Sequence, residues 1–285
     1  MKNTTTTLDK TTGILLVCTG HVYYARLAYN LLASIRYHDK DIPVAILVNG
    51  DGFELLDPDC RKQFTHVIPI PVDSDPYRVK LCLDQYTPFD NTLYMDVDMV
   101  WCPFKTPKQL IADCAGSEFQ CITRSRESTD ELDMKFWMDL KEVKQVYGFE
   151  QVYNISSEIM YFEGKPKIFE IARKVYEQPK VSINKFGSGY PDEAYLIIAL
   201  ELEKYQMKLN PWEPTYWQPR YYMQIHSRQH IQTFYALSVG GSHTIDHVKQ
   251  IYDSLLDMYF YHTGMPGNPF RFIQKSLIFN DRRKI

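Results

Sequence analysis

The stretch TLYMDVDMVW, residues 92–101, decides the fold of this chain. Apolar, β-prone residues make up most of this stretch, LYM at 93–95 and MVW at 99–101. They favour a buried strand of a parallel or mixed sheet. Asp96 and Asp98 interrupt this run, with only Val97 between them. A buried carboxylate is costly unless it is paired or binds a cation. Side chains at i and i+2 of a strand point the same way, roughly 6–7 Å apart, so the two aspartates could hold one hard divalent cation, directly or through water.

A second interpretation of the two aspartates stays open. They could cap neighbouring backbone groups or pair with Arg and Lys, and a bare Asp-x-Asp sequence most often does so. Its position at the end of an apolar strand, about a hundred residues into an α/β pattern, favours the metal. We therefore predict Asp96 and Asp98 as ligands of Mn²⁺ or Mg²⁺.

Composition indicates an ordinary globular protein. The chain has 285 residues, 45% hydrophobic and 24% charged, and a formal net charge of -3, which gives no global bias toward nucleic acid or membrane. The N-terminal MKNTTTTLDKTTG has no apolar signal core, and no run approaches the ~18 apolar residues of a membrane span. The six cysteines form no C-x-x-C pair, and Cys18 and Cys82 lie in apolar segments. These features predict free thiols in a reducing compartment and a cytoplasmic protein.

The first half of the chain alternates strands with helices. Apolar runs predict strands at 14–18, 44–48 and 66–70. Between them, a stripe at helical spacing predicts a helix over 24–35, and a shorter one over 53–64 is interrupted by Pro58. Asp75 and Pro76 open a further helix that ends near Pro88. This alternation predicts an α/β fold with a mostly parallel sheet flanked by helices.

The second half is more mixed. It predicts strands at 119–123 and 153–162, a partly helical segment at 125–147, and helices at 166–178, 191–205 and 245–258. We expect a disordered lead-in over 1–12, one domain over 13–270, and a C-terminal tail over 271–285.

Several stretches together resemble a known family. They are ILLVCTGHVYYARLAYNLLASI, YRVKL, PFDNTLYMDVDMVW, SSEIMYF, PDEAYL and YHTGMPGNPF, which span most of residues 14–270. The chain resembles the GT-A-fold glycosyltransferases, most of all the glycogenin and lipopolysaccharide galactosyltransferase family. The aspartate strand is the specific part, and the other stretches gain weight from their order. The resemblance implies a GT-A (Rossmann-like) fold with a C-terminal helical and loop extension. It also implies that 13–270 is a single catalytic domain, with 13–105 as the nucleotide-binding half and 106–270 as the sugar and acceptor half.

The resemblance also implies a metal site. By it, Asp96 and Asp98 bind Mn²⁺ or Mg²⁺, which holds the diphosphate of a UDP-sugar, and a late histidine completes the site. His262, two residues before Gly264, is the candidate. Rival histidines of lower rank are His226, His243 and His247.

Two departures from the family pattern concern the donor. The family places a lysine a few residues after the glycine, whereas here Met265 to Pro269 read MPGNP, so Arg271 or backbone groups would replace it. The family strand N-S-G-x-M-x-F is SSEIMYF here, with Ser156 and Ser157 in the sugar-binding region.

The chemistry of the residues suggests further roles. A nucleotide binds at the carboxyl ends of the first parallel strands of an open sheet, which places Thr19, Gly20 and His21 at the base and ribose. Arg78 and Lys80 lie near the phosphates or ribose, or else on a solvated helix face.

Two acidic residues, Asp192 and Glu193, open a predicted helix. They either complement the helix dipole or bind sugar hydroxyls. If a carboxylate acts as nucleophile or base, the candidates are Asp192, Glu193 and Glu158.

These observations predict a metal-dependent glycosyltransferase that moves a hexose or pentose from a UDP-sugar to an acceptor hydroxyl, with retention implied by the resemblance. The alternatives are a sugar nucleotidyltransferase and a catalytically inactive binding module of the same fold. The acceptor stays open among a glycan, a lipid-linked glycan, a protein tyrosine and a modified nucleobase. An aromatic stretch is either a packed flap or an acceptor platform: Trp212, Tyr216, Trp217, Tyr221 and Tyr222.

Overall fold

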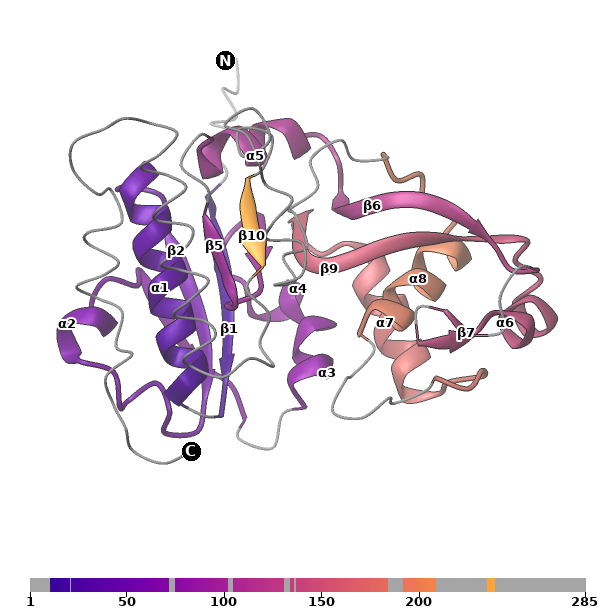
Figure 1. Ribbon diagram of the computed structural model, residues 1–285, viewed down its shortest axis with the longest axis horizontal. Coiled ribbons are helices and arrows are strands. Elements are labelled where there is room, and N and C mark those ends of the chain that lie inside the picture. The colour runs from indigo at the N-terminus through magenta and orange to yellow at the C-terminus, as the bar shows by residue number, and fades with distance from the viewer. Residues whose placement is uncertain are drawn as a thin grey trace, which may run out of the picture.

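The centre of the molecule is a six-stranded sheet with the strand order β3-β2-β1-β4-β9-β6 (Figure 1). The structure, a computed structural model, describes residues 11–20, 22–71, 75–101, 105–130, 134–135, 137–183, 192–208 and 235–238. The strands are β1 (Thr12–Thr19), β2 (Val44–Asn49), β3 (His66–Pro69), β4 (Asn91–Met95), β6 (Phe119–Ser128) and β9 (Gln151–Glu163). Strands β3, β2, β1 and β4 are parallel, and β9 is antiparallel to both of its neighbours. The predicted α/β fold with a mostly parallel sheet is confirmed.

Both faces of the central strand β1 are buried. Ile14 and Leu16 of β1 pack into one core with α1 (Val22–His38) and α5 (Pro107–Cys114). Leu15 points to the opposite core, which is built with α7 (Lys167–Glu177) and α8 (Asp192–Leu202). Because alternate residues of one strand meet different helices, the strand is apolar throughout, as is typical of a parallel sheet covered on both sides.

The stretch 92–101 does not form the single strand predicted for it. Strand β4 ends at Met95, residues 97–98 form a turn, and β5 (Met99–Trp101) pairs antiparallel with β10 (Ala236–Ser238) in a separate small sheet. The backbone N–H of Trp101 donates to Ser34 Oγ of α1 at 2.9 Å, which ties β5 to that helix. The carboxylates therefore lie where the chain leaves the main sheet, and the expected strand spacing of the two side chains does not apply.

Two other segments differ from expectation. Only α2 (Pro58–Arg61), capped by Asp57, is helical within 53–64. The helix expected from Pro76 to near Pro88 is two short helices, α3 (Pro76–Lys80) and α4 (Leu83–Tyr86). Between them, the Leu81 carbonyl accepts a 2.8 Å hydrogen bond from Arg173 of α7.

The segment 125–147 is helical in part, as predicted. Strand β6 runs on to Ser128, the hairpin of β7 (Met134–Lys135) and β8 (Met138–Asp139) comes next, and α6 (Leu140–Tyr147) is the helical part.

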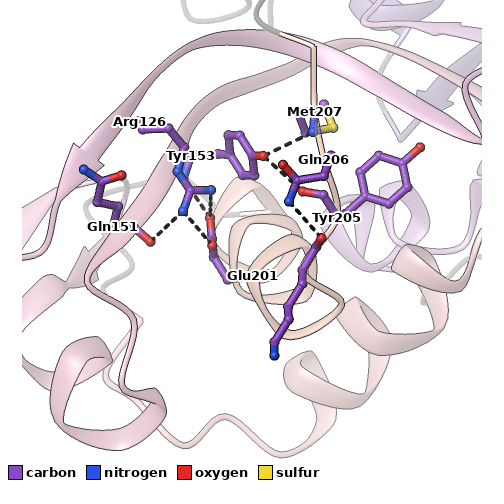
Figure 2. Close-up of polar contacts among 8 residues, drawn as sticks. Arg126, Gln151, Tyr153, Glu201, Tyr205, Gln206 and Met207 are labelled. Atoms are coloured by element: carbon purple, nitrogen blue, oxygen red, sulfur yellow. Dashed lines mark hydrogen bonds and ion pairs between the residues drawn. The ribbon is translucent and has the colours of Figure 1, made fainter.

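Helix α8 is fixed to the long β6–β9 pair at its C-terminal end (Figure 2). Glu201 accepts hydrogen bonds from the Arg126 guanidinium at 2.7 and 3.0 Å and from the Tyr153 backbone N–H at 3.1 Å. The guanidinium also lies 4.1 Å from the centre of the Tyr153 ring. Since residues 194–200 are buried on all sides, α8 is a central helix whose two ends are its only polar parts.

The cysteines and helices of the described residues add two facts. Cys18, Cys60, Cys82, Cys114 and Cys121 are free thiols, as predicted for these five. Within these residues, none of the helices combines the length and the apolar character that crossing a membrane requires.

Candidate active site at the carboxyl end of β4

The functional side chains gather where β4 ends. Leu16 of β1 pairs with Met95, so Asp96 follows directly beyond the last paired residue of β4. The Asp96 backbone N–H donates to the Glu158 carbonyl of β9 at 2.8 Å, which holds this residue to the sheet after the strand has ended. Asp96 is therefore fixed at the carboxyl edge of the parallel strands, the usual place of ligands in open α/β sheets.

Lys80 joins two of the predicted site carboxylates. Its Nζ lies 2.9 Å from Asp96 and 3.6 Å from Asp192 Oδ2. Although burial disfavours its charged form, Asp192 and Asp96 raise the pKa of Lys80 well above its ordinary value. The lysine is thus a permanent cation between the end of β4 and the start of α8.

Tyr94 supports Asp96 from within the strand. Its hydroxyl donates to Asp96 Oδ1, and Lys80 Nζ lies 5.8 Å from the centre of its ring. Burial, and then the charge of Asp96, raise the pKa of Tyr94 well above its usual range, so the phenol stays protonated and remains a donor. Asp96 therefore accepts from Tyr94 and Lys80, which together engage both of its oxygens, and a carboxylate has further lone pairs for another partner.

Asp192 is buried and incompletely paired. Its side chain is only 7% exposed, and its Oδ2 has no hydrogen-bond partner among the described residues, because Lys80 Nζ at 3.6 Å is too distant. Burial raises the pKa of Asp192, while Lys80 and a hydrogen bond from the Ser157 side chain oppose that rise. An unsatisfied buried carboxylate oxygen is expensive, so a ligand that donates a hydrogen bond here would be favoured.

Glu193 adds a second carboxyl group at the start of α8. Its Oε1 accepts a 3.1 Å hydrogen bond from the Ser157 backbone N–H. Burial, and then the charge of Asp192, raise the pKa of Glu193 to about 7, although hydrogen bonds from Ser157 and Trp137 and the charge of Lys80 oppose the rise. Ser157 of β9 thus positions both carboxyl groups, through its side chain and its backbone.

Asp98 lies in the turn after β4, near α1. Burial, and then the charge of Asp98, raise the pKa of the Tyr23 phenol in α1 to about 12. Asp98 is partly exposed, as is Asp96. The turn therefore leaves both aspartates accessible, one facing Lys80 and the other toward the N-terminal part of α1.

Thr19 and Gly20 lie at the end of β1, beside this edge. Gly20 has a φ of 77°, and its N–H donates to Asn49 Oδ1 at 2.7 Å. A built Cβ on Gly20 would have no heavy atom within 4 Å, so the space over it is open. The backbone here could approach a flat ligand closely.

The remaining predicted residues fall into two groups. Arg78 pairs with Glu177 of α7 at 3.7 Å with both side chains 57% exposed, and Glu158 Oε2 accepts a 3.3 Å hydrogen bond from Ser156 Oγ. The following predicted site residues lie outside the described residues: His21, His262, Gly264 and Arg271. The rival histidines and the aromatic stretch 212–222 lie there too.

The donor set suits a hard divalent cation. Asp96 and Asp98 supply carboxylate oxygens, the ligand type that Mg²⁺ and Mn²⁺ prefer, and Asp96 has lone pairs to spare. Among the described residues, no group of three or more His, Cys, Asp or Glu side chains could hold a metal. Phosphate oxygens, water or a residue such as His262 would have to complete the coordination.

Three contributors to this site were not predicted. Tyr94 could have been found, because it lies two residues before Asp96 and so on the same side of the strand. Asn49, which bonds Gly20, ends β2 just as Thr19 ends β1. Trp137 carries no sequence signal, since its position depends on the β7–β8 hairpin packing near α8.

Comparison with known proteins supports the same fold. No protein-family model matches the sequence, and no curated protein does. Among solved structures, galactosyltransferase LgtC in complex with donor and acceptor sugar analogs has a TM-score of 0.54 at 15% identity, covering 91% of this chain and 99% of that one. Mouse xyloside xylosyltransferase 1 has a TM-score of 0.51 at 10% identity, covering 81% and 98%. The bifunctional glycosyltransferase WbbM has a TM-score of 0.54 at 12% identity, covering 95% of this chain and 52% of its own.

Because the identities are 10–15%, the similarity to these neighbours is one of fold alone. All three are described as glycosyltransferases of one kind or another. The mostly parallel sheet and these neighbours together show the GT-A fold that the sequence predicted.

Proposed function

We propose that this protein is a metal-dependent glycosyltransferase that transfers a sugar from a UDP-sugar donor to an acceptor hydroxyl. The observation that carries the proposal is the arrangement at the end of β4, where Lys80 lies between Asp96 and the incompletely paired Asp192. Among the described residues, one cation shared by several carboxyl groups gives this end of β4 an acidic character that a divalent metal and a hydroxyl-rich ligand would both complement. The fold and its structural neighbours support the same activity.

Each residue has a role in this proposal. Asp96 and Asp98 would hold Mn²⁺ or Mg²⁺, and the ion would stabilise the negative charge of the departing diphosphate. Lys80 would supply a fixed positive charge beside that diphosphate, held in place by Asp96. Thr19 and Gly20 would border the nucleotide at the end of β1.

The sugar would bind at the start of α8. Asp192 Oδ2 would accept a hydrogen bond from a sugar hydroxyl, which removes the cost of an unpaired buried oxygen. Glu193 would orient its neighbour through Ser157. A retaining outcome is part of the proposal, with Asp192, Glu193 and Glu158 as the carboxyl groups nearest the reacting carbon.

The test is a donor screen with a matched pair of variants. The purified full chain is incubated with a panel of UDP-hexoses and UDP-pentoses, with and without Mn²⁺, and released UDP is measured. We expect release from at least one donor, dependent on the metal, and a loss of about 100-fold or more in Asp98→Asn, since metal stabilisation of the leaving charge is worth several kcal/mol.

The control is Asp59→Asn, which removes an exposed aspartate of α2 and should leave UDP release unchanged. Metal-dependent release at the wild-type rate in Asp98→Asn would refute the metal assignment. Failure to release UDP from every donor, with or without a candidate acceptor extract, would refute the activity.

A further inference from the structure

Trp137 occupies a costly backbone position beside the site carboxyl groups. Its φ is 65°, a left-handed conformation that bulky residues rarely adopt, and its side chain is 36% exposed. The indole N–H, its only polar group, donates a hydrogen bond to Glu193. A large aromatic residue that keeps a disfavoured conformation at such a site is a reason to look for a ligand.

The chain that follows Trp137 is firmly held. Met138 is fully buried and forms an antiparallel bridge with Ile183. Asp139 caps α6, accepting from the N–H groups of Lys141 and Glu142 at 2.9 and 3.1 Å. Glu142 Oε2 in turn accepts from the Ser182 N–H at 2.7 Å, which joins α6 to the segment 182–183. The indole is therefore positioned before any ligand arrives, at little further entropic cost.

The chemistry around this indole matches a sugar ring. A pyranose has an apolar C–H face, which stacks on an aromatic ring, and hydroxyl groups at its edge, which donate hydrogen bonds to carboxylates. Trp137 offers the partly exposed aromatic surface, and Asp192 offers the buried Oδ2, which has no hydrogen-bond partner among the described residues. Glu193 lies between them, bonded to the indole and adjacent to Asp192 in the chain.

We propose that Trp137 is the aromatic wall of a pyranose-binding subsite whose polar side is Asp192 and Glu193. The inference rests on the proposed function and sharpens it, because it makes a ring-stacking sugar the ligand on this side of the site. The ring is either the transferred sugar of the donor or a sugar of a glycan acceptor.

Two variants separate the ring of Trp137 from its N–H group. Trp137→Ala removes both, whereas Trp137→Phe keeps an aromatic face and loses only the hydrogen bond to Glu193. The matched control is Tyr147→Ala, which removes an aromatic ring of α6 that is half-buried and stacked 5.3 Å from Phe149.

The measurement is binding of methyl glycosides of glucose, galactose, xylose and N-acetylglucosamine to the full chain by titration NMR, with UDP and Mn²⁺ present. We expect saturable binding of at least one glycoside, a Kd at least tenfold higher in Trp137→Ala, and a Kd within about threefold of wild type in Trp137→Phe and Tyr147→Ala. The Kd of UDP should be the same in all four proteins. Repeating the titration with an intact UDP-sugar in place of UDP identifies the source: a glycoside that is then excluded occupies the place of the donor sugar, and one that still binds occupies an acceptor place.

Three outcomes would overturn the inference: no saturable glycoside binding by the wild type, an unchanged Kd in Trp137→Ala, or equal weakening in the Ala and Phe variants, which would assign the effect to the hydrogen bond. None of them depends on turnover. Failure of the proposed function would show separately, as absence of UDP release in the donor screen.

Discussion

Each end of α8 carries a carboxyl group, and the two groups differ in their hydrogen-bond partners. At the C-terminal end, Glu201 is 9% exposed and accepts hydrogen bonds from Arg126 and Tyr153 (Figure 2). At the N-terminal end, the Asp192 side chain is 7% exposed, its Oδ2 has no hydrogen-bond partner among the described residues, and it shares the cation of Lys80 with Asp96. The helix is the same, but Asp192 is buried whereas Glu201 is half-buried, so the two ends differ in burial as well as in the supply of partners.

This difference in partners distinguishes a carboxylate that stabilises the fold from one that could bind a ligand. A buried carboxylate with a complete set of donors fixes its helix in place, and its loss would leave the guanidinium without its partner. A buried carboxylate without such a set is costly to the fold, and such groups persist where a ligand supplies the missing partner. On this argument Glu201 belongs to the scaffold and Asp192 to the site.

Asp192→Asn tests the N-terminal end and should have the largest effect. If this carboxylate bears on the reacting sugar, kcat for UDP release should fall about 100-fold, while the Kd of UDP, set at the metal and the nucleotide, stays near wild type. Stability should not fall, because the substitution removes a charge that burial disfavours. Steady-state kinetics measure kcat, calorimetry measures the Kd of UDP, and urea unfolding measures the free energy of unfolding.

Two results would contradict this placement of Asp192. Full kcat would make the residue structural, and a loss of UDP affinity in proportion to activity would move it to the nucleotide site. Asn at this position keeps the volume of the side chain, so an altered fold is not expected to confuse the result.

Glu201→Gln tests the C-terminal end, and the expected effect is on stability. The amide cannot accept both bonds of the Arg126 guanidinium and would turn a donor toward it, so the free energy of unfolding should fall by about 2–3 kcal/mol. At temperatures where the variant is folded, kcat should be within about twofold of wild type. A stable variant with low kcat would reverse the assignment of the two ends.

The sequence predicted more of the fold than of the geometry of the site. Apolar periodicity and turn residues were sufficient for β1, α1, β2, β3 and α8, since these elements carry their burial pattern in their own residues. The break after Met95 was missed, because the apolar residues 99–101 pair with β10, more than a hundred residues later. The break between α3 and α4 was missed for a related reason, since Arg173 of α7 bonds the Leu81 carbonyl there.

The site shows the same limit. Asp96, Asp98, Asp192 and Glu193 could be named from their local pattern. Lys80 was expected at the phosphates or ribose, and only the folded chain reveals that it joins Asp96 to Asp192. Such pairings depend on which helix packs beside which strand, and a local sequence pattern does not determine that packing.

The Glu193→Gln variant tests the comparison between the two ends of α8 through the pH dependence of stability. Its expected effect is the smallest of the three. The pKa of Glu193 is raised to about 7 in the folded chain, above the ordinary value of 4.5. Below about pH 4.5 the carboxyl group is protonated in both states and does not affect stability. Between 4.5 and 7 the unfolded chain loses its proton first, so the wild type is progressively destabilised, and above 7 the full penalty remains.

Gln does not titrate and can still accept the Ser157 N–H, so the variant escapes this penalty. Its free energy of unfolding should equal that of the wild type near pH 4.5 and exceed it by about 1–3 kcal/mol at pH 8, at about 1.4 kcal/mol per pKa unit. The groups that face Glu193 are Asp192, Lys80, Ser157 and Trp137, and Lys80 keeps its charge over this range. Urea unfolding of both proteins at pH 5, 6, 7 and 8, without added metal, measures the difference. A difference that is constant or shrinks with rising pH would mean that burial does not disfavour the charge of Glu193, and the contrast between the two ends of α8 would then rest on Asp192 alone.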